Sequence, residues 1–313
     1  MKTIEIFCEN NNQYKEYPLG TTLLEIAGDM GIEMPFPICG AMVNHKVREL
    51  TFEVVKPKDI RFIDYSHPDG KRIFTRSLFF ILYVAVRDIM PKAKLKIDHG
   101  ISRGYYCEFE NLPAPLSDDF VEKIKKRMLE IIADDVPFER RGKQMVRVLN
   151  EYGAAGLTDK VELFEGTGWL YAYVYYLNNN INYFHGHMLP STGYITNFDI
   201  ERFNGGIFLR LPSEEGTGLL RTFIPQDKLF EIFQLHKDWA SILNMANVGR
   251  LNQQVKQGKE GEILKISEAL HEKKIAEIAS LVADRNPQVK LILIAGPSSS
   301  GKTTFSKRLA VQL

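Results

Sequence analysis

The sequence has few cysteines and no marked excess of charge of either sign. Cys8, Cys39 and Cys107 are odd in number and widely spaced, so they supply neither a disulfide framework nor a C-x-x-C metal motif. We therefore expect reduced thiols in a cytoplasmic protein. The 40 Lys and Arg residues almost balance the 39 Asp and Glu residues, for a net charge of +1. Because nucleic-acid-binding proteins usually carry a broad basic surface, nucleic acid is not an expected partner.

Long hydrophobic runs are also missing. The longest apolar run, Ser77 to Val86, is bounded by Arg76 and Arg87 and is much shorter than the roughly 20 residues that a membrane helix needs. It therefore predicts a buried helix, and we expect no membrane partner. The first seven residues alternate polar and apolar like a strand and do not resemble a signal peptide. The length of 313 residues predicts two or three domains.

A glycine-rich segment fits the phosphate-binding pattern G-x-x-x-x-G-K-[ST]. The residues of this loop are Gly296, Pro297, Ser298, Ser299, Ser300, Gly301, Lys302 and Thr303, followed by Thr304. An apolar run at 289–295 precedes the loop and a helical pattern at 303–313 follows it. This predicted strand–loop–helix order is the context that a Walker A loop requires. The alternative is a Gly/Ser turn with an incidental lysine.

The loop predicts a site for MgATP at residues 296–304. Its glycines let successive backbone N–H groups converge on one anion, and the start of the helix adds further free donors. Lys302 is expected to reach the β- and γ-phosphates and to act catalytically by stabilising transition-state charge. The Thr303 hydroxyl is expected to bind the Mg²⁺ ion.

Residues 288–313 hold only one predicted strand and one helix. A P-loop fold needs a multi-stranded parallel sheet covered on both faces. We therefore expect these residues to be the start of a truncated kinase domain, with the catalytic base beyond Leu313 and no activity in this chain alone. A missing domain would add on the order of 150–200 residues.

Two further regions are predicted from periodicity. Residues 1–62 read as strand, strand, helix and strands, the order of a ubiquitin-like β-grasp. The predicted elements are strands at 3–8, 14–17, 52–55 and 60–64, a further strand and turn at 42–45, and a helix opened by a capping box at 22–25 and closed by Gly31. Residues 226–287 show helical spacing in two stretches separated by a polar break at 256–261, which predicts a linker of two helices.

Residues 1–225 resemble the N-terminal part of threonyl-tRNA synthetases. Residues 20–27 and 41–50 resemble their TGS domain, although His45 stands where the family usually has Gly, which favours a turn of another type. The second, editing-type domain is matched at 63–225, in scattered motifs at 91–97, 104–110, 122–140 and 186–193. The resemblance implies an α+β multidomain chain, with the P-loop start as its α/β part.

The family's editing site is expected to be lost. The family uses two histidines spaced H-x-x-x-H on a helix, plus a Cys and a His from a later segment. Counting back from Pro91 and Pro190, the matching positions hold Phe80, Val84, Phe184 and Met188. Apolar side chains cannot bind zinc, activate water or transfer a proton. The resemblance therefore implies a hydrophobic plug with no zinc and no deacylation of mischarged tRNA.

Nearby polar residues leave alternatives open. His185 and His187 lie two residues apart, on one face if that stretch is a strand, and could join His99 or Cys107 in a replacement metal site. The competing interpretation is histidines that are simply hydrogen-bonded within the structure. Ser191 and Thr192 could hold a ligand, or residues 190–193 form only a turn.

Residues 292–304 resemble the loop of the uridine kinase and phosphoribulokinase-like branch. With the preceding domains, they resemble bacterial nucleoside-kinase-like proteins. The resemblance implies an ATP-dependent nucleoside kinase, uridine being the first choice, with nucleotide and nucleoside as partners. Two alternatives remain. One is a tRNA-linked deacylase-type module. The other is a regulatory protein whose N-terminal domains bind a small ligand and whose P-loop domain has a different NTPase activity.

Overall fold

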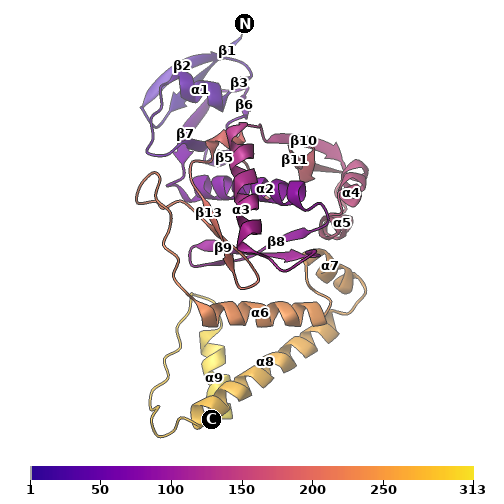
Figure 1. Cartoon of the computed structure of the whole chain (residues 1–313). Helices are drawn as coiled ribbons and strands as arrows, with labels where there is room; N and C mark the ends of the chain where they lie inside the picture. Colours follow the sequence, from indigo (N-terminus) through magenta and orange to yellow (C-terminus); the bar gives the residue numbers. More distant parts are fainter. Residues whose placement is uncertain (1) are drawn as a thin grey trace. The chain divides into compact units, whose positions relative to one another are not determined.

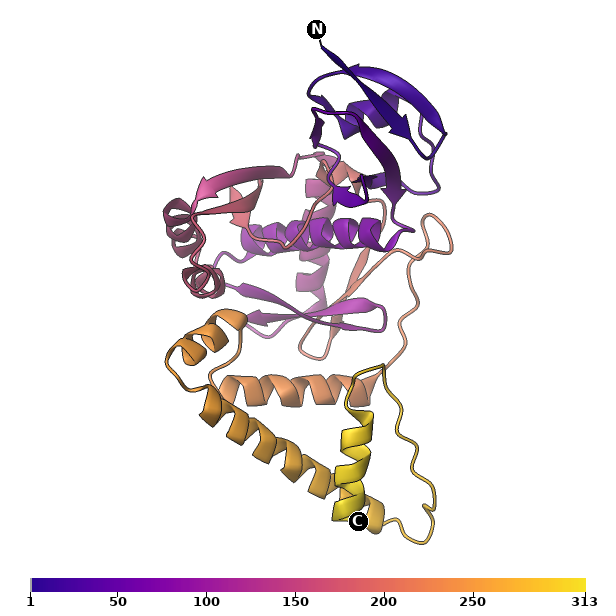
Figure 2. The same cartoon turned by 180° about the vertical axis from the view of Figure 1, so that it is seen from behind.

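The computed structural model describes residues 2–313 (Figures 1 and 2). The chain is an α+β protein with mixed and antiparallel sheets, and it divides into two compact units, Met1–Lys237 and Asp238–Leu313. Within residues 2–313, no helix combines the length and the apolar character needed to cross a membrane.

The first sheet lies at the N-terminal end of the first unit and has the strand order β2-β1-β7-β4-β5 (Figure 1). Its strands are β1 (Thr3–Cys8), β2 (Gln13–Pro18), β4 (Ile38–Val43), β5 (Lys46–Arg48) and β7 (Lys58–Asp64). Strands β1 and β7 are parallel and the other pairs are antiparallel. Helix α1 (Leu23–Asp29) shares one core with this sheet, and the short strands β3 (Thr21–Thr22) and β6 (Glu53–Val54) pair beside it.

Two local predictions in this region can be checked directly. The capping box of α1 is present, because the Thr22 hydroxyl accepts from the Glu25 N–H at 3.2 Å and the Thr22 N–H donates to the Glu25 carboxylate at 2.8 Å. The expectation of another turn type at His45 is wrong. Asn44 and His45 have φ values of 46° and 63°, as a two-residue type I′ turn requires. Both residue types tolerate the left-handed region, and the Asn44 amide oxygen also accepts from the Asp59 N–H.

A second core lies around helix α2 (Pro68–Ile89), as the apolar run Ser77 to Val86 predicted. Helix α3 (Asp118–Ala133) packs on α2, and both helices contact a four-stranded antiparallel sheet of order β13-β14-β9-β8. Its strands are β8 (Lys94–Ile101), β9 (Gly104–Glu110), β13 (Asp199–Phe203) and β14 (Gly206–Arg210), and the short 3-10 helix η1 (Thr192–Tyr194) precedes β13.

A third, antiparallel sheet has the order β10-β11-β12. Its strands are β10 (Glu139–Gln144), β11 (Tyr171–Leu177) and β12 (Asn180–Asn182). Helices α4 (Met145–Ala154) and α5 (Thr158–Glu165) bury one face of this sheet in a small separate core. Strand β11 therefore alternates between residues facing that core, such as Ala172 and Val174, and residues of the opposite face.

Helices dominate the remaining chain, and two predictions fail there. Residues 226–287 form three helices instead of two, namely α6 (Asp227–Ile242), α7 (Val248–Lys256) and α8 (Glu260–Ala283). The expected strand at 289–295 is not a strand, because this segment pairs with no other strand in the described chain. Its side chains reflect this, since Leu291 and Leu293 are exposed while Ile294 packs with α8 and helix α9 (Lys302–Gln312).

The three cysteines are free thiols, and all of them are buried in the first unit. Burial raises the pKa of the Cys39 thiol to about 12, and it also raises the pKa values of Cys8 and Cys107. The thiols are therefore protonated at neutral pH.

Candidate functional site

The four positions matched to the synthetase editing site come together in one core. Phe80 and Val84 lie one turn apart on α2 and are fully buried, and Met188 is 1% exposed. The Phe184 ring is partly buried and its centroid lies 5.2 Å from that of Phe80. We call these four side chains the apolar plug. It contains no group that could bind zinc or move a proton.

The histidines considered for a replacement site lie in different surroundings. The segment at 183–189 is not a strand. His185 lies 3.5 Å from the Tyr183 hydroxyl, and the His99 ring stacks on Phe233 with centroids 4.1 Å apart. Nowhere in residues 2–313 do three His, Cys, Asp or Glu side chains gather as metal ligands would. The structure thus does not assemble the replacement site.

Thr192 has a structural role. Its hydroxyl donates to the Ile131 carbonyl at 2.7 Å and accepts from the Val136 N–H at 2.9 Å. Ser191 forms a backbone bridge with Pro137. These contacts hold the turn at 190–193 against α3, so the turn interpretation fits better than a ligand site.

A charged cluster that sequence reasoning missed lies beside the plug. The Glu49 carboxylate accepts from the Tyr175 hydroxyl at 2.8 Å and lies 3.5 Å from both Arg140 Nη1 and His187 Nδ1. Arg76 joins the group by donating to the His187 carbonyl at 2.7 Å. We call these five residues the Glu49 cluster. They come from five separate segments, so no sequence spacing connects them.

The Glu49 cluster is held mostly out of water. Only 13% of the Glu49 side chain is exposed. Burial alone would raise the pKa of Glu49, but the nearby His187 ring, the hydrogen bond from Tyr175 and the Arg140 charge hold that pKa below its ordinary value. Burial lowers the pKa of Arg76 and raises that of Tyr175. The cluster is therefore a buried ion network that fixes the segment carrying half of the plug.

Gly186 is needed for this network. Its φ is 122°, and an added Cβ would lie 2.6 Å from the guanidinium carbon of Arg76. Only glycine allows Arg76 to approach the backbone this closely.

The predicted phosphate-binding loop lies in the second unit. Ser299 and Gly301 have φ values of 60° and 78°, and α9 begins at Lys302. No backbone N–H of residues 298–301 donates to a carbonyl among the residues that the structure describes. Lys302 Nζ donates to the Pro297 carbonyl at 2.5 Å, so the side chain folds back over the loop. Thr303 and Thr304 are exposed in the first turn of α9.

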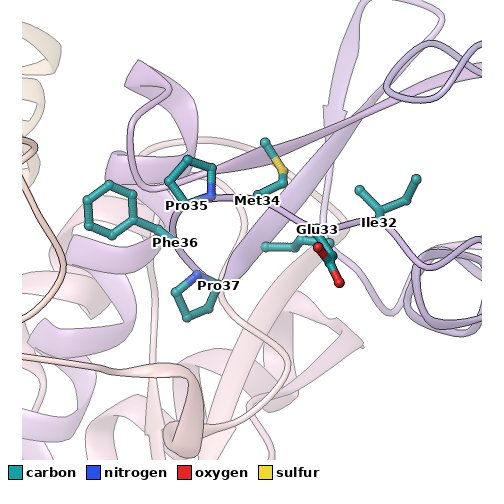
Figure 3. Close-up of a pocket in the computed structure, with 7 residues that line it drawn as sticks. Ile32, Glu33, Met34, Pro35, Phe36 and Pro37 are labelled. Carbon is teal, nitrogen blue, oxygen red and sulfur yellow. The ribbon is translucent and has the colours of Figure 1, made fainter.

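The surface also has a hollow of about 450 Å³ beside the first sheet, which Figure 3 shows. It is lined by Ile32, Glu33, Met34, Pro35, Phe36, Pro37 and Ile38. Glu33 is the only ionisable side chain in this lining, and none of the predicted site residues contributes to it. The hollow therefore adds no catalytic group to the candidate sites.

Comparison with known proteins places the chain near threonine–tRNA ligases. No family model matches the chain. It is 28% identical over 149 residues to the threonine–tRNA ligase of Desulforamulus reducens, which covers 48% of this chain and 23% of that protein. It is 26% identical over 196 residues to the ligase of Carboxydothermus hydrogenoformans, and this match covers 62% of this chain and 31% of that protein. It is 23% identical over 205 residues to the ligase of Geobacter sp. strain M21, and this match covers 66% of this chain and 32% of that protein.

The matches thus span between 23% and 32% of each relative's length. They support the synthetase part of the resemblance, and none of them supports a uridine kinase or P-loop domain.

The prediction of an ATP-dependent nucleoside kinase is wrong. The relatives described here are threonine–tRNA ligases, which point to a tRNA-synthetase-type role and favour the alternative of a tRNA-linked module. Similarity over 196 to 205 residues is stronger evidence of function than one short loop motif. A P-loop shows that a phosphate chain can be held, and it carries no information on the acceptor.

Proposed function

We propose that this chain is a tRNA-directed module of the threonine–tRNA ligase type that binds tRNA without deacylating it. Residues 1–62 would be the TGS-like β-grasp and residues 63–225 the editing-type domain. The similarity to threonine–tRNA ligases over as much as two thirds of the chain carries the tRNA part of this proposal. The apolar plug supports the second part, that the chain does not hydrolyse the aminoacyl ester.

Hydrolysis of an ester needs a positioned water and a group that removes its proton. Phe80, Val84 and Met188 offer neither, because they are buried and carry no polar group that could hold or activate a water. The Glu49 carboxylate of the neighbouring cluster is already engaged by Tyr175, Arg140 and His187. Binding without turnover is therefore the function that fits this site.

Two measurements on the full chain test the proposal. Binding of threonine-accepting tRNA should be detectable at low salt and should weaken as salt rises, because phosphate contacts release counterions. Incubation with serine-charged tRNA should leave the rate of deacylation at the buffer background. Deacylation above background, or no tRNA binding at low salt, would contradict the proposal.

We propose as a second function that residues 296–304 hold the phosphates of MgATP. The supporting observation is the loop geometry, in which free backbone N–H groups at 298–301 precede a helix start. Lys302 would turn from the Pro297 carbonyl to the phosphates, and Thr303 would bind Mg²⁺.

The Lys302→Ala variant tests this second proposal by ATP titration. Loss of one charge-assisted contact should weaken binding by about tenfold to a hundredfold. Lys307→Ala, on an exposed lysine of the same helix, is the matched control and should bind as the unmodified chain does. Equal affinity of both variants would contradict the assignment.

A further inference from the structure

The third sheet has one face that carries exposed tyrosines. Tyr171 and Tyr173 on β11 are 64% and 59% exposed. Their partners across the β10–β11 ladder are Gln144 and Gly142, and Arg140 of the same face pairs with Tyr175. We call Arg140, Gly142, Gln144, Tyr171 and Tyr173 the tyrosine face. The opposite face is covered by α4 and α5, so the sheet is firmly supported from behind (Figures 1 and 2).

The tyrosine face has a defined geometry. The Arg140 guanidinium carbon lies 3.8 Å from the centroid of the Tyr173 ring, which is a close cation–π contact. Gly142 allows the Tyr173 ring to lie across β10, since an added Cβ would stand 3.2 Å from that ring. The ring is therefore held in place before any partner arrives, which lowers the entropic cost of binding.

Charge on this face favours an anionic partner. Arg140 is one-third exposed, and the described residues of this face include no carboxylate. Arg140 lies 3.5 Å from the buried Glu49 carboxylate, but the same cluster also contains Arg76, so its two guanidinium groups outnumber its one carboxylate. Exposed aromatic rings beside an arginine on a supported sheet are the combination that stacks unpaired bases and binds the connecting phosphate.

The spacing of the Tyr171 and Tyr173 rings also fits a single RNA strand whose neighbouring bases are unstacked. Residues two apart on a strand are separated by about 7 Å, roughly twice the 3.4 Å per nucleotide of a stacked strand. Neighbouring bases could therefore be splayed, one on each ring, but a continuous stack or a duplex would not match.

We propose that the tyrosine face binds unpaired nucleotides of an RNA strand, with bases on Tyr171 and Tyr173 and a phosphate near Arg140. This inference rests on the proposed tRNA-directed function and names the surface that would receive a single-stranded segment. The balanced net charge predicted that nucleic acid is not a partner, and RNA binding here departs from that expectation because a few local contacts suffice for one short segment.

The test uses the full chain and a single-stranded RNA of about eight nucleotides, within the site size typical of such surfaces. Tyr171→Ala and Tyr173→Ala should each weaken its binding about tenfold. Tyr171→Phe and Tyr173→Phe, which keep the rings, should bind nearly as the unmodified chain does. Tyr14→Ala is the matched control, since Tyr14 is 67% exposed and lies in the first sheet. Arg140→Gln should lower the slope of affinity against salt by about one phosphate contact.

Several outcomes would overturn the inference. These are unchanged RNA binding by both alanine variants, equal affinity for the same RNA in a duplex, or self-association of the chain that the variants abolish while RNA binding persists. If tRNA binds but the alanine variants leave RNA binding unchanged, only this inference fails. If the short RNA binds through the tyrosines but threonine-accepting tRNA does not bind, the proposed function fails instead.

Discussion

The apolar plug and the loop at 296–304, which we propose binds phosphate, place their polar groups in opposite ways. The plug buries Phe80, Val84 and Met188 completely and contains nothing ionisable. The loop leaves backbone donors unpaired and keeps Lys302 and Thr303 near or at the surface. Side chains at the plug are therefore fixed by packing, whereas those at the loop remain available to a ligand. Substitutions should accordingly cost stability at the plug and affinity at the loop.

Phe80→His should give the largest change in stability. The substitution removes apolar packing and places an imidazole in a site without a free polar partner, so we expect a loss of about 3 kcal/mol in the free energy of unfolding. Denaturant titration measures this. Leu129→His on the exposed side of α3, where Leu129 is 51% exposed, should change the free energy by less than about 0.5 kcal/mol. Similar losses for both variants would contradict a closed plug.

Glu49→Ala should have the next largest effect. It should lower the free energy of unfolding by about 2 kcal/mol at neutral pH, because it leaves Arg140 and His187 without their carboxylate. The folded-state pKa of Glu49 is below its ordinary value of 4.5, so its stabilisation is complete above that value. The stabilisation disappears as pH falls through the folded-state pKa. Stability measured against pH should thus show the two proteins converging in acid, and a constant difference down to the acid limit would count against the network.

Gly301→Ala should lower the free energy of unfolding by about 1–2 kcal/mol, since a φ of 78° strains any residue that has a Cβ. Crowding is not the cause, because nothing lies within 4 Å of the position that the added Cβ would take. Gly261→Ala in the first turn of α8 is the control. Its surroundings are equally open and its φ is not positive, so alanine should stabilise slightly. Thermal unfolding of both variants would separate backbone strain from crowding.

Lys302→Ala should have the smallest effect on stability, within about 0.5 kcal/mol, although it is expected to affect ATP binding strongly. Its one recorded hydrogen bond joins exposed groups of the same loop. A large loss of stability would mean that Lys302 supports the fold, and the contrast between plug and loop would then disappear.

The sequence predicted the elements that depend on local chemistry. The α1 capping box, the strand at 3–8 and the buried helix around Ser77 to Val86 all follow from short patterns of adjacent residues. The strand expected at 289–295 failed because strands need a partner from elsewhere, and apolar content alone cannot supply one. The third helix at 226–287 was missed because α7 has only 9 residues, too few turns to stand out beside the longer helices on either side.

The candidate sites show the same division. The four plug positions could be located because they are tied to a motif with fixed spacing, and the loop at 296–304 remains a proposed phosphate site. The Glu49 cluster could not be located, since Glu49, which follows β5, meets Arg140 and Tyr175 only after the first and third sheets have packed. The tyrosine face was also missed, since it depends on the β10–β11 register and on which face α4 and α5 cover.

The three buried thiols give the protein an internal reporter of its own opening. Cys8, Cys39 and Cys107 all belong to the first unit, and the described part of Asp238–Leu313 contains no cysteine. Each thiol is shielded and protonated, so an alkylating reagent can reach it only when the surrounding core opens. Labelling of Cys107 against Cys8 over time would therefore distinguish loosening around the plug from loosening of the first sheet, without any introduced probe.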